Sequence, residues 1–370
     1  MSAHSQIPAP DRVSTIELFF DLVFVFTITQ VAEVIVHHPD ARGIGHAVIE
    51  LSVLAWMFGG YAWLTNAAGS LISTCRILLL AGMAAFFICA LSVPHAFDED
   101  GVVFGVGYFL VNVVHLTGLF LGTTPKPAVW KLMPYNLASA SLVLAAGFVT
   151  GPLDWWLWGG AVAVQLLTPI FGRVRQGGFH LNPTHFAERH GLMILIVLGE
   201  SLVSVGLAVT ASDAHASAPL ILGALAGLTA SIAMWWAYFA GEDERAVRAH
   251  EQATDRERSD QGILGFGLAH LIMIVGIIAI AAATKLSLSQ LLAPMPMFGA
   301  WLMAAGCGLY LLGGATFRWA LGYASPLARI GGAIASVIVV PAGLYGSPAA
   351  SMASVAIVTF ATIGIERATD

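Results

Sequence analysis

The sequence predicts an all-α polytopic bundle of membrane-spanning helices, and three observations support this. Hydrophobic residues make up 58% of the 370 residues and charged residues only 10%. A soluble domain averages about 45–50% apolar and about 25% charged residues. About twelve apolar runs have the length of roughly 20 residues that a helix needs to cross a bilayer. Basic residues gather in alternate loops between these runs. The excess apolar surface is therefore expected to face lipid.

The apolar runs divide the chain into about twelve predicted spans. Residues 346–348, Gly-Ser-Pro, separate the last two runs, so a re-entrant turn is the alternative to two separate spans there. In chain order the predicted spans are 16–36, 47–65, 75–94, 101–122, 132–150, 155–172, 190–210, 218–240, 261–284, 296–317, 328–345 and 349–365.

The basic residues predict the orientation, because Lys and Arg collect in cytoplasmic loops. Of the 16 Lys and Arg residues, only Arg42 and Lys285 fall on the side away from the N-terminus. Both termini are therefore predicted to be cytoplasmic. The other fourteen are Arg12, Arg76, Lys126, Lys131, Arg173, Arg175, Arg189, Arg245, Arg248, Arg256, Arg258, Arg318, Arg329 and Arg367.

Several functional classes are disfavoured by composition and motif. The net charge of −6 comes with no basic block, which argues against nucleic-acid binding. The three cysteines show no CxxC spacing, so neither a disulfide framework nor a zinc site is expected. The chain has no GxSxG, HExxH or P-loop motif, so an enzyme is disfavoured and no cofactor or metal is predicted.

The first span carries carboxylates where a membrane helix should be apolar. A carboxylate at the bilayer centre costs roughly 2.5–3.5 kcal/mol on insertion scales. Glu17 lies at the cytoplasmic edge, where it is expected to reach water. Asp21 lies one turn deeper on the same face, while Gln30 and Glu33 fall on roughly the opposite face. This helix is therefore expected to be enclosed by other helices or to line a wet cavity.

A second unusual span follows Asn182, which is expected to cap its helix ahead of Pro183. His185, Glu188 and Arg189 crowd its cytoplasmic entrance as a predicted gate or ion-pair group, with Glu188 expected to pair with Arg189 or a loop arginine. Glu200 lies about 18 Å further along the helix, which predicts a place near mid-membrane.

Each of these residues has a structural alternative. Glu17 and Glu188 favour helix N-termini, where negative charge is stabilised. Glu200 could hold a neighbouring helix through a hydrogen bond instead of serving a transport path. His115 and His270 are expected near the same depth, either as packing residues or as helpers in a proton relay.

The two unusual spans also indicate an internal repeat. The stretches that begin at Glu17 and Glu188 each reach a polar residue after about twelve or thirteen positions, and both begin on the same predicted side. Two parallel six-helix halves are therefore predicted, residues 1–172 and 173–370. The charged stretch 241–260 in the second half is expected to form a solvated cytoplasmic linker helix.

At these stretches the chain resembles the bacterial low-temperature-requirement A family of membrane proteins. The matching residues are Glu17-Leu-Phe-Phe-Asp21-Leu-Val-Phe-Val, His185-Phe-Ala-Glu188-Arg189 and Leu198-Gly199-Glu200-Ser201. His190 departs from the family pattern, in which an aromatic residue such as Phe is expected. The resemblance implies a polytopic inner-membrane protein whose molecular activity is not established.

A fainter likeness concerns residues 19–24, which are similar to the Phe-Ser-Asp motif of a non-classical potassium-channel family built from six-helix repeats. Phe20 stands in place of the serine, and Thr15 stands where a basic residue is expected.

The leading hypothesis is a proton- or cation-coupled secondary transporter or an ion-permeable protein. Asp21 and Glu200 would bind the cation or carry protons, with His115 and His270 as helpers. Glu17, His185, Glu188 and Arg189 would form the gate. The alternatives are a scaffold or sensor that works through residues 241–260, and a membrane enzyme that acts on lipid. The predicted partners are the lipid bilayer and a small cation or proton.

Overall fold

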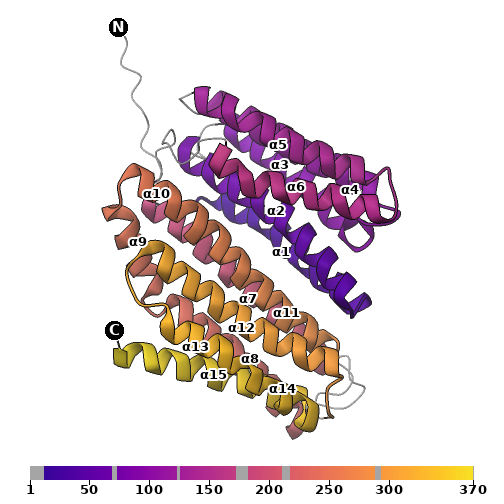
Figure 1. Ribbon diagram of the computed structural model, residues 1–370, viewed down its shortest axis with the longest axis vertical. Coiled ribbons are helices and arrows are strands. Elements are labelled where there is room, and N and C mark those ends of the chain that lie inside the picture. Colours follow the sequence, from indigo (N-terminus) through magenta and orange to yellow (C-terminus); the bar gives the residue numbers. More distant parts are fainter. Residues whose placement is uncertain are drawn as a thin grey trace. The chain divides into compact units, whose positions relative to one another are not determined.

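The computed structural model describes residues 12–68, 73–122, 126–171, 182–210, 217–287 and 293–369, which contain helices and no strand (Figure 1). Each predicted span falls on helical structure, which confirms the all-α prediction. The first group of helices is α1 (Thr15–His37), α2 (Ala41–Ala68), α3 (Ser73–Ser92), α4 (Gly101–Gly122), α5 (Lys126–Ala146) and α6 (Pro152–Phe171), with the short 3-10 turn Val93–His95 after α3.

The remaining described helices continue this order. The run from α13 to η6 and the helix α15 occupy the last two predicted spans. The bounds are α7 (Pro183–Thr210), α8 (Ala218–Phe239), α9 (Glu242–Gln252), α10 (Asp255–Gln261), the π-helix η3 (Gly262–Ala269), α11 (His270–Lys285), α12 (Met297–Leu321), α13 (Leu327–Ala335), η5 (Ser336–Ile338), α14 (Val339–Pro341), η6 (Ala342–Gly346) and α15 (Pro348–Thr369).

Among the described residues, 10 helical segments are long and apolar enough to cross a membrane. They include both Leu327–Gly346 and Pro348–Thr369, the two segments between which the sequence allowed a re-entrant turn. The other two predicted spans, 132–150 and 155–172, fall on the helices α5 and α6, of 21 and 20 residues, which are not among these ten segments. By length and composition the chain is a multi-pass integral membrane protein.

Polar side chains cap the first turns of α7 and α2. The Asn182 side chain accepts hydrogen bonds from the backbone N–H groups of Thr184 and His185, at 3.1 and 3.3 Å, which confirms the predicted cap of α7. Asp40 caps α2 in the same way, since its carboxylate accepts the Gly43 N–H at 2.9 Å. This backbone hydrogen bond holds the pKa of Asp40 below its usual range.

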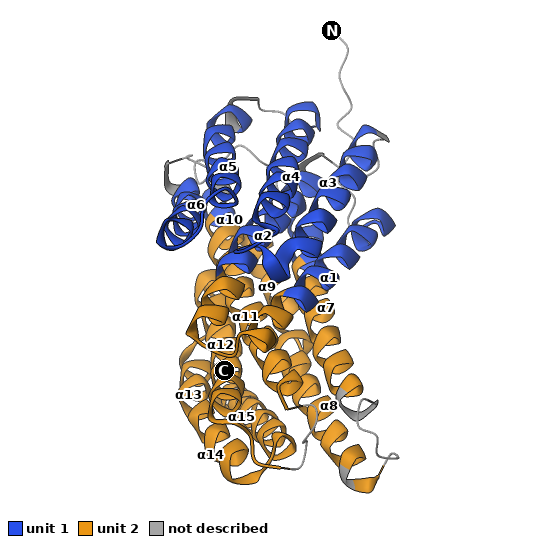
Figure 2. Cartoon of the chain, turned by 90° about the vertical axis from the view of Figure 1, so that its right-hand side faces the viewer, with its two compact units in different colours: residues 1–30, 49–189, 253–259 blue, residues 31–48, 190–252, 260–370 orange. Residues whose placement is uncertain are grey.

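The chain forms two compact units (Figure 2). The first draws on residues 1–30, 49–189 and 253–259, and the second on residues 31–48, 190–252 and 260–370. Helices α1, α2 and α7 each contribute to both units. The predicted boundary at 172/173, together with Arg173 and Arg175, lies outside the described residues, so the two predicted halves stay a prediction.

Within the first unit, the helices from α3 to α6 pack in chain order, each against the next (Figure 1). Aromatic rings join α1, α2 and α3: the ring centroid of Phe20 lies 5.0 Å from that of Tyr61 and 5.5 Å from that of Phe86. Phe24 lies 4.3 Å from Phe58 by the same measure. These buried contacts hold the acidic first turns of α1 inside the unit.

Within the second unit, α11 and α12 approach closely because glycines face each other. A Cβ atom on Gly306 would lie 2.7 Å from the carbonyl oxygen of Gly276, and one on Gly276 would lie 2.6 Å from the carbonyl oxygen of Gly306. Small residues at a membrane-helix interface permit this backbone approach.

The charged stretch 241–260 is helical, as predicted, but it is not wholly solvated. It forms α9 and most of α10, and α9 buries one face consisting of Glu242, Ala246 and His250. His250 Nδ1 lies 2.8 Å from Gln261 Oε1. The expectation of a solvated linker is wrong for this face, because residues four apart line one side of a helix and pack together.

The close approach of α11 and α12 predicts that Gly306→Ala destabilises the protein by about 1–3 kcal/mol, the usual cost of overpacking. Thermal unfolding of the purified protein in detergent measures the change. Gly331→Ala is the control, because a Cβ atom there meets nothing within 4 Å. Equal melting temperatures for the two variants would contradict the prediction.

Candidate functional site

In the first unit, Arg189 on α7 forms ion pairs with two acids on α1. Its Nη2 atom lies 2.8 Å from Asp21 Oδ1, and its Nη1 atom lies 3.3 Å from Glu17 Oε1. His185 Nε2 lies 3.2 Å from the same Glu17 oxygen. We call Glu17, Asp21, His185 and Arg189 the Arg189 cluster. Its side chains are at most 1% exposed.

Aromatic rings enclose the guanidinium group of this cluster. The Arg189 Cζ atom lies 5.8 Å from the ring centroid of Phe20 and 5.4 Å from that of Phe58. Such distances allow a cation–π attraction, which is strongest where water is excluded. The two rings therefore help to keep a buried positive charge in place.

Asn66 on α2 sets the tautomer of His185. Its Oδ1 accepts the backbone N–H of Asn182 at 2.8 Å, so its Nδ2 is the donor that reaches the Asn182 carbonyl at 3.0 Å. The same Nδ2 lies 3.2 Å from His185 Nδ1. Nδ1 must then accept, which leaves the proton of the neutral ring on Nε2, facing Glu17.

The cluster corrects two expectations. Glu17 does not reach water, because its side chain is fully buried. Glu188 does not pair with Arg189: it is exposed, and its Oε2 accepts the backbone N–H of Val13 at 3.0 Å. Neighbouring residues on a helix do not face each other, so Arg189 points to α1 and Glu188 points away.

The pairs within the cluster show how the first turns of α1 and α7 are aligned. Glu17 meets His185 and Asp21 meets Arg189, and both pairs are 168 residues apart in sequence. A constant separation means that these two helix segments run in the same direction. The predicted parallel course of the two acidic spans is therefore confirmed within this unit.

In the second unit, Lys285 at the end of α11 bridges two further acids. Its Nζ lies 2.9 Å from Glu33 Oε1 and 3.0 Å from Glu200 Oε1. Ser204 donates to Glu200 Oε1 at 3.3 Å. We call Glu33, Glu200 and Lys285 the Lys285 cluster. Glu200 and Lys285 are 6% exposed and Glu33 is 31% exposed, so one acid of the bridge is partly open.

A third group of charges in the second unit differs from these two clusters. Arg318 binds both oxygens of Glu242 at 2.9 and 3.0 Å, and Arg329 binds Glu366 at 2.6 Å. Tyr323 also donates to Glu242 at 2.8 Å. We call the two arginines and two glutamates the Arg318–Arg329 network. It joins α9, α12, α13 and α15, and its two acids are matched by its two buried arginines, with the exposed Arg245 as a further cation 3.4 Å from Glu242 Oε1.

The histidines predicted as helpers are engaged in packing contacts. His115 Nε2 lies 3.0 Å from the Gly60 carbonyl oxygen, to which it donates. His270 Nδ1 donates to the Gly265 carbonyl at 3.0 Å, so its Nε2 accepts the Tyr238 hydroxyl at 2.8 Å. His190, the departure from the family pattern, lies among rings, 5.3 Å from both Phe266 and His270 by ring centroid.

Sequence reasoning did not identify Lys285 or Asn66 as site residues. A buried acid such as Glu200 is expected to pair with a cation, and Lys285 ends one of the apolar runs. Which acid Lys285 reaches depends on how the helices pack.

One local sequence signal was available for the contacts of Glu17. Ser14-Thr15-Ile16-Glu17 is a capping box, and Glu17 Oε2 accepts both the backbone N–H and the hydroxyl of Ser14, at 2.9 and 2.7 Å.

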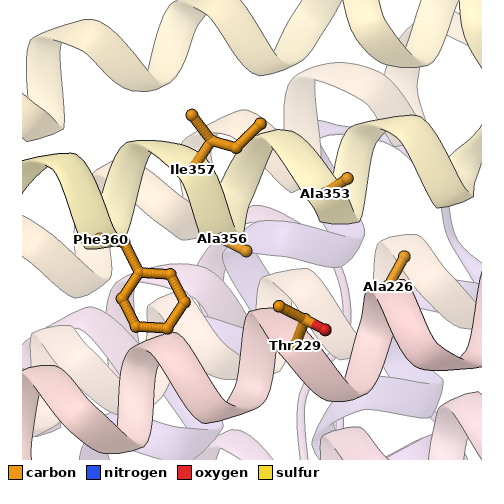
Figure 3. A pocket seen from close by; sticks show the side chains of 6 residues that line it. All are labelled: Ala226, Thr229, Ala353, Ala356, Ile357 and Phe360. Atoms are coloured by element: carbon orange, nitrogen blue, oxygen red, sulfur yellow. The ribbon is translucent and has the colours of Figure 1, made fainter.

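A groove elsewhere in the second unit has a different character. It lies between α8 and α15, has a volume of about 450 Å³, and presents no ionisable side chain (Figure 3). Its lining therefore has no acid or base that could take up a proton. The lining residues are Ala226, Thr229, Ala353, Ala356, Ile357 and Phe360.

No group of three or more potential metal ligands lies close together in the described part of the chain.

Comparison with known proteins identifies relatives of the chain. The family model of the bacterial low temperature requirement A protein matches residues 12–363, nearly the whole chain. An uncharacterized protein, RA0937, of Rhizobium meliloti (strain 1021) is 28% identical over 293 residues, which are 75% of this chain and 70% of the relative. No solved structure matches.

From the ion pairs of the Arg189 cluster we predict that removing the arginine strongly lowers the stability of the protein. Arg189→Met leaves two buried acids without a permanent positive charge, and we expect a loss of about 3–5 kcal/mol in unfolding free energy. Thermal unfolding in detergent measures it, and adding Asp21→Asn should restore part of the loss.

The control is Arg248→Met, which removes an exposed pair with Glu244 at 3.6 Å. Exposed pairs contribute about 0–1 kcal/mol. An Arg189→Met variant as stable as the control would show that the buried pairs do not hold α1 to α7.

Proposed function

From the premise that this chain belongs to the bacterial low temperature requirement A family, we propose that it moves protons or small monovalent cations across the membrane. The Arg189 cluster of the first unit and the Lys285 cluster of the second unit are each a candidate ion-binding group. Asp21 and Glu200 are the principal binding groups, and Glu17, His185, Glu188 and Arg189 act as the gate.

One observation carries this proposal: each cluster has one acid more than it has permanent cations. Glu17 and Asp21 share Arg189, and Glu33 and Glu200 share Lys285. Uncompensated charge in an apolar interior is costly, so each cluster is neutral only with one further positive charge. A proton or a monovalent cation supplies that charge. In the Arg189 cluster a second proton on His185 also supplies it, and at the Lys285 cluster a second proton on His37 does so, because His37 Nδ1 lies 3.8 Å from Glu33 Oε2.

The Arg318–Arg329 network is the structural counterexample in the same chain. Its two arginines balance Glu242 and Glu366 without any added ion. A cluster that only joined helices would be expected to balance in this way. The excess acid is therefore what distinguishes an ion-binding group from a packing group.

Unused hydrogen-bonding atoms in the Arg189 cluster support the same function. Glu17 Oε1, Asp21 Oδ2 and Arg189 Nε are buried and make no hydrogen bond with the described residues. Buried polar atoms are nearly always satisfied by protein or water. The two carboxylate oxygens can accept a hydrogen bond from water or bind the carried ion, whereas Arg189 Nε–H can only donate to water.

The membrane and orientation are part of the proposal. We place the protein in the bacterial inner membrane with both termini in the cytoplasm, because fourteen of the 16 basic residues then face the cytoplasm. In this orientation the first turns of α1 and α7, with the Arg189 cluster, lie toward the cytoplasm.

Replacing the deeper acid tests the function. In proteoliposomes, Glu200→Gln should lower proton or monovalent-cation flux by about tenfold or more, because the Lys285 cluster then has equal numbers of acids and cations. Flux is measured with a pH-sensitive or cation-sensitive dye after an imposed gradient.

Glu366→Gln is the matched control, since Glu366 is a buried acid paired with arginine outside the path. It should lower stability while the folded fraction keeps wild-type flux. Wild-type flux from folded Glu200→Gln protein would remove Glu200 from the path. Absence of flux from the wild-type protein for every monovalent cation tried would reject the function.

The orientation has its own test. A fluorescent protein fused after Asp370 should fluoresce in bacterial cells, and alkaline phosphatase at the same position should be inactive, since phosphatase folds only outside the cytoplasm. Phosphatase inserted in the connection between α1 and α2 should be active. The reverse pattern would invert the orientation.

A further inference from the structure

Glu50 on α2 is a buried acid that neither cluster uses. It is nine residues after the first residue of α2 and eighteen before the last, so it lies well inside the helix. Its side chain is 1% exposed. Its Oε2 atom makes no hydrogen bond with any residue that the structure describes. No ion pair to Glu50 occurs among the described residues either.

No ionisable group on the helices in contact with α2 forms an ion pair with Glu50 in the part of the chain that the structure describes, and Arg76 on α3 is exposed. On its own helix, His46 lies one turn earlier on the same face. The groups on the neighbouring helices bind other partners: Glu17 and Asp21 on α1 bind Arg189, Glu33 on α1 binds Lys285, His115 on α4 binds the Gly60 carbonyl, and His185 on α7 binds Glu17.

An ionised carboxylate without a partner is the least tolerated group in an apolar interior. Each acid of the two clusters has a cation within 3.3 Å, which lowers this cost. Glu50 has no such contact, so only the neutral acid form fits its surroundings. A neutral carboxylic acid holds a bound proton. The proton is released only when the carboxyl group comes into contact with water or a cation.

We propose that Glu50 is a proton-binding site, which holds its proton in the arrangement described here and releases it when α2 is rehydrated during transport. The release step rests on the proposed function, whereas the bound proton does not. The ligand is then a proton rather than a metal cation, since one neutral acid with no second oxygen ligand offers no coordination shell. In release, the O–H bond of Glu50 breaks and water accepts the proton.

Infrared difference spectroscopy of the full-length protein in lipid tests the bound proton. A protonated carboxylic acid has a C=O stretching band that an ionised carboxylate lacks. At neutral pH the wild-type protein should show such a band, and the difference between the wild-type and Glu50→Gln spectra should show the loss of one C=O component, that of Glu50. Glu50→Asp should keep the band at a shifted frequency, because it retains an acid. Glu366→Gln should leave the band unchanged, since Glu366 is paired with arginine.

Proton flux in proteoliposomes tests the release. Glu50→Gln should abolish proton flux while its melting temperature stays at the wild-type value, because Gln resembles the neutral acid in shape and charge. Glu50→Asp should recover part of the flux.

The outcomes separate this proposal from the general function. The same infrared band in wild type and Glu50→Gln overturns the bound proton, whatever the flux. Wild-type proton flux from Glu50→Gln overturns the release, while transport itself stands. Absence of all flux from the wild-type protein rejects both the transport function and the release, and the infrared band then decides the bound proton alone.

Discussion

The structure depends on one constraint: a charge placed among apolar helices must find an opposite charge. Arg189 shows its effect most directly, because a single guanidinium group binds Glu17 and Asp21, which lie one turn apart on α1. This binding aligns the first turns of α1 and α7 in parallel. It also buries the acids that led the sequence analysis to expect an enclosed helix.

The other charges obey the same constraint in two ways. In the Arg318–Arg329 network, equal numbers of acids and arginines join four helices, and nothing further is needed for neutrality. In the Arg189 and Lys285 clusters, two acids share one permanent cation. The balanced network holds helices together, whereas the unbalanced clusters have a place for one more positive charge. This difference in stoichiometry, rather than the presence of acids, is what points to ion movement.

Several uncharged polar residues in the spans need no partner from another helix. Thr27, Thr168 and Thr284 each donate a hydroxyl hydrogen bond to the carbonyl four residues earlier on the same helix. The helix itself satisfies these groups, so they are compatible with an apolar environment. An acid accepts but does not donate when ionised, and a helix interior offers it no free N–H group. The acids therefore remain as the residues that need a partner from another helix.

The sequence by itself determined the all-α membrane fold, the places of the helices, the cap at Asn182 and the unusual standing of Asp21 and Glu200. These features depend on composition, apolar run length and neighbours within one turn, all of which are local. Only the tertiary structure decided that Glu17 is buried, that Arg189 turns to α1 rather than to Glu188, and that Lys285 bridges Glu33 and Glu200. These pairings join residues far apart in the chain, and the packing of helices fixes which of several acids a given cation can reach.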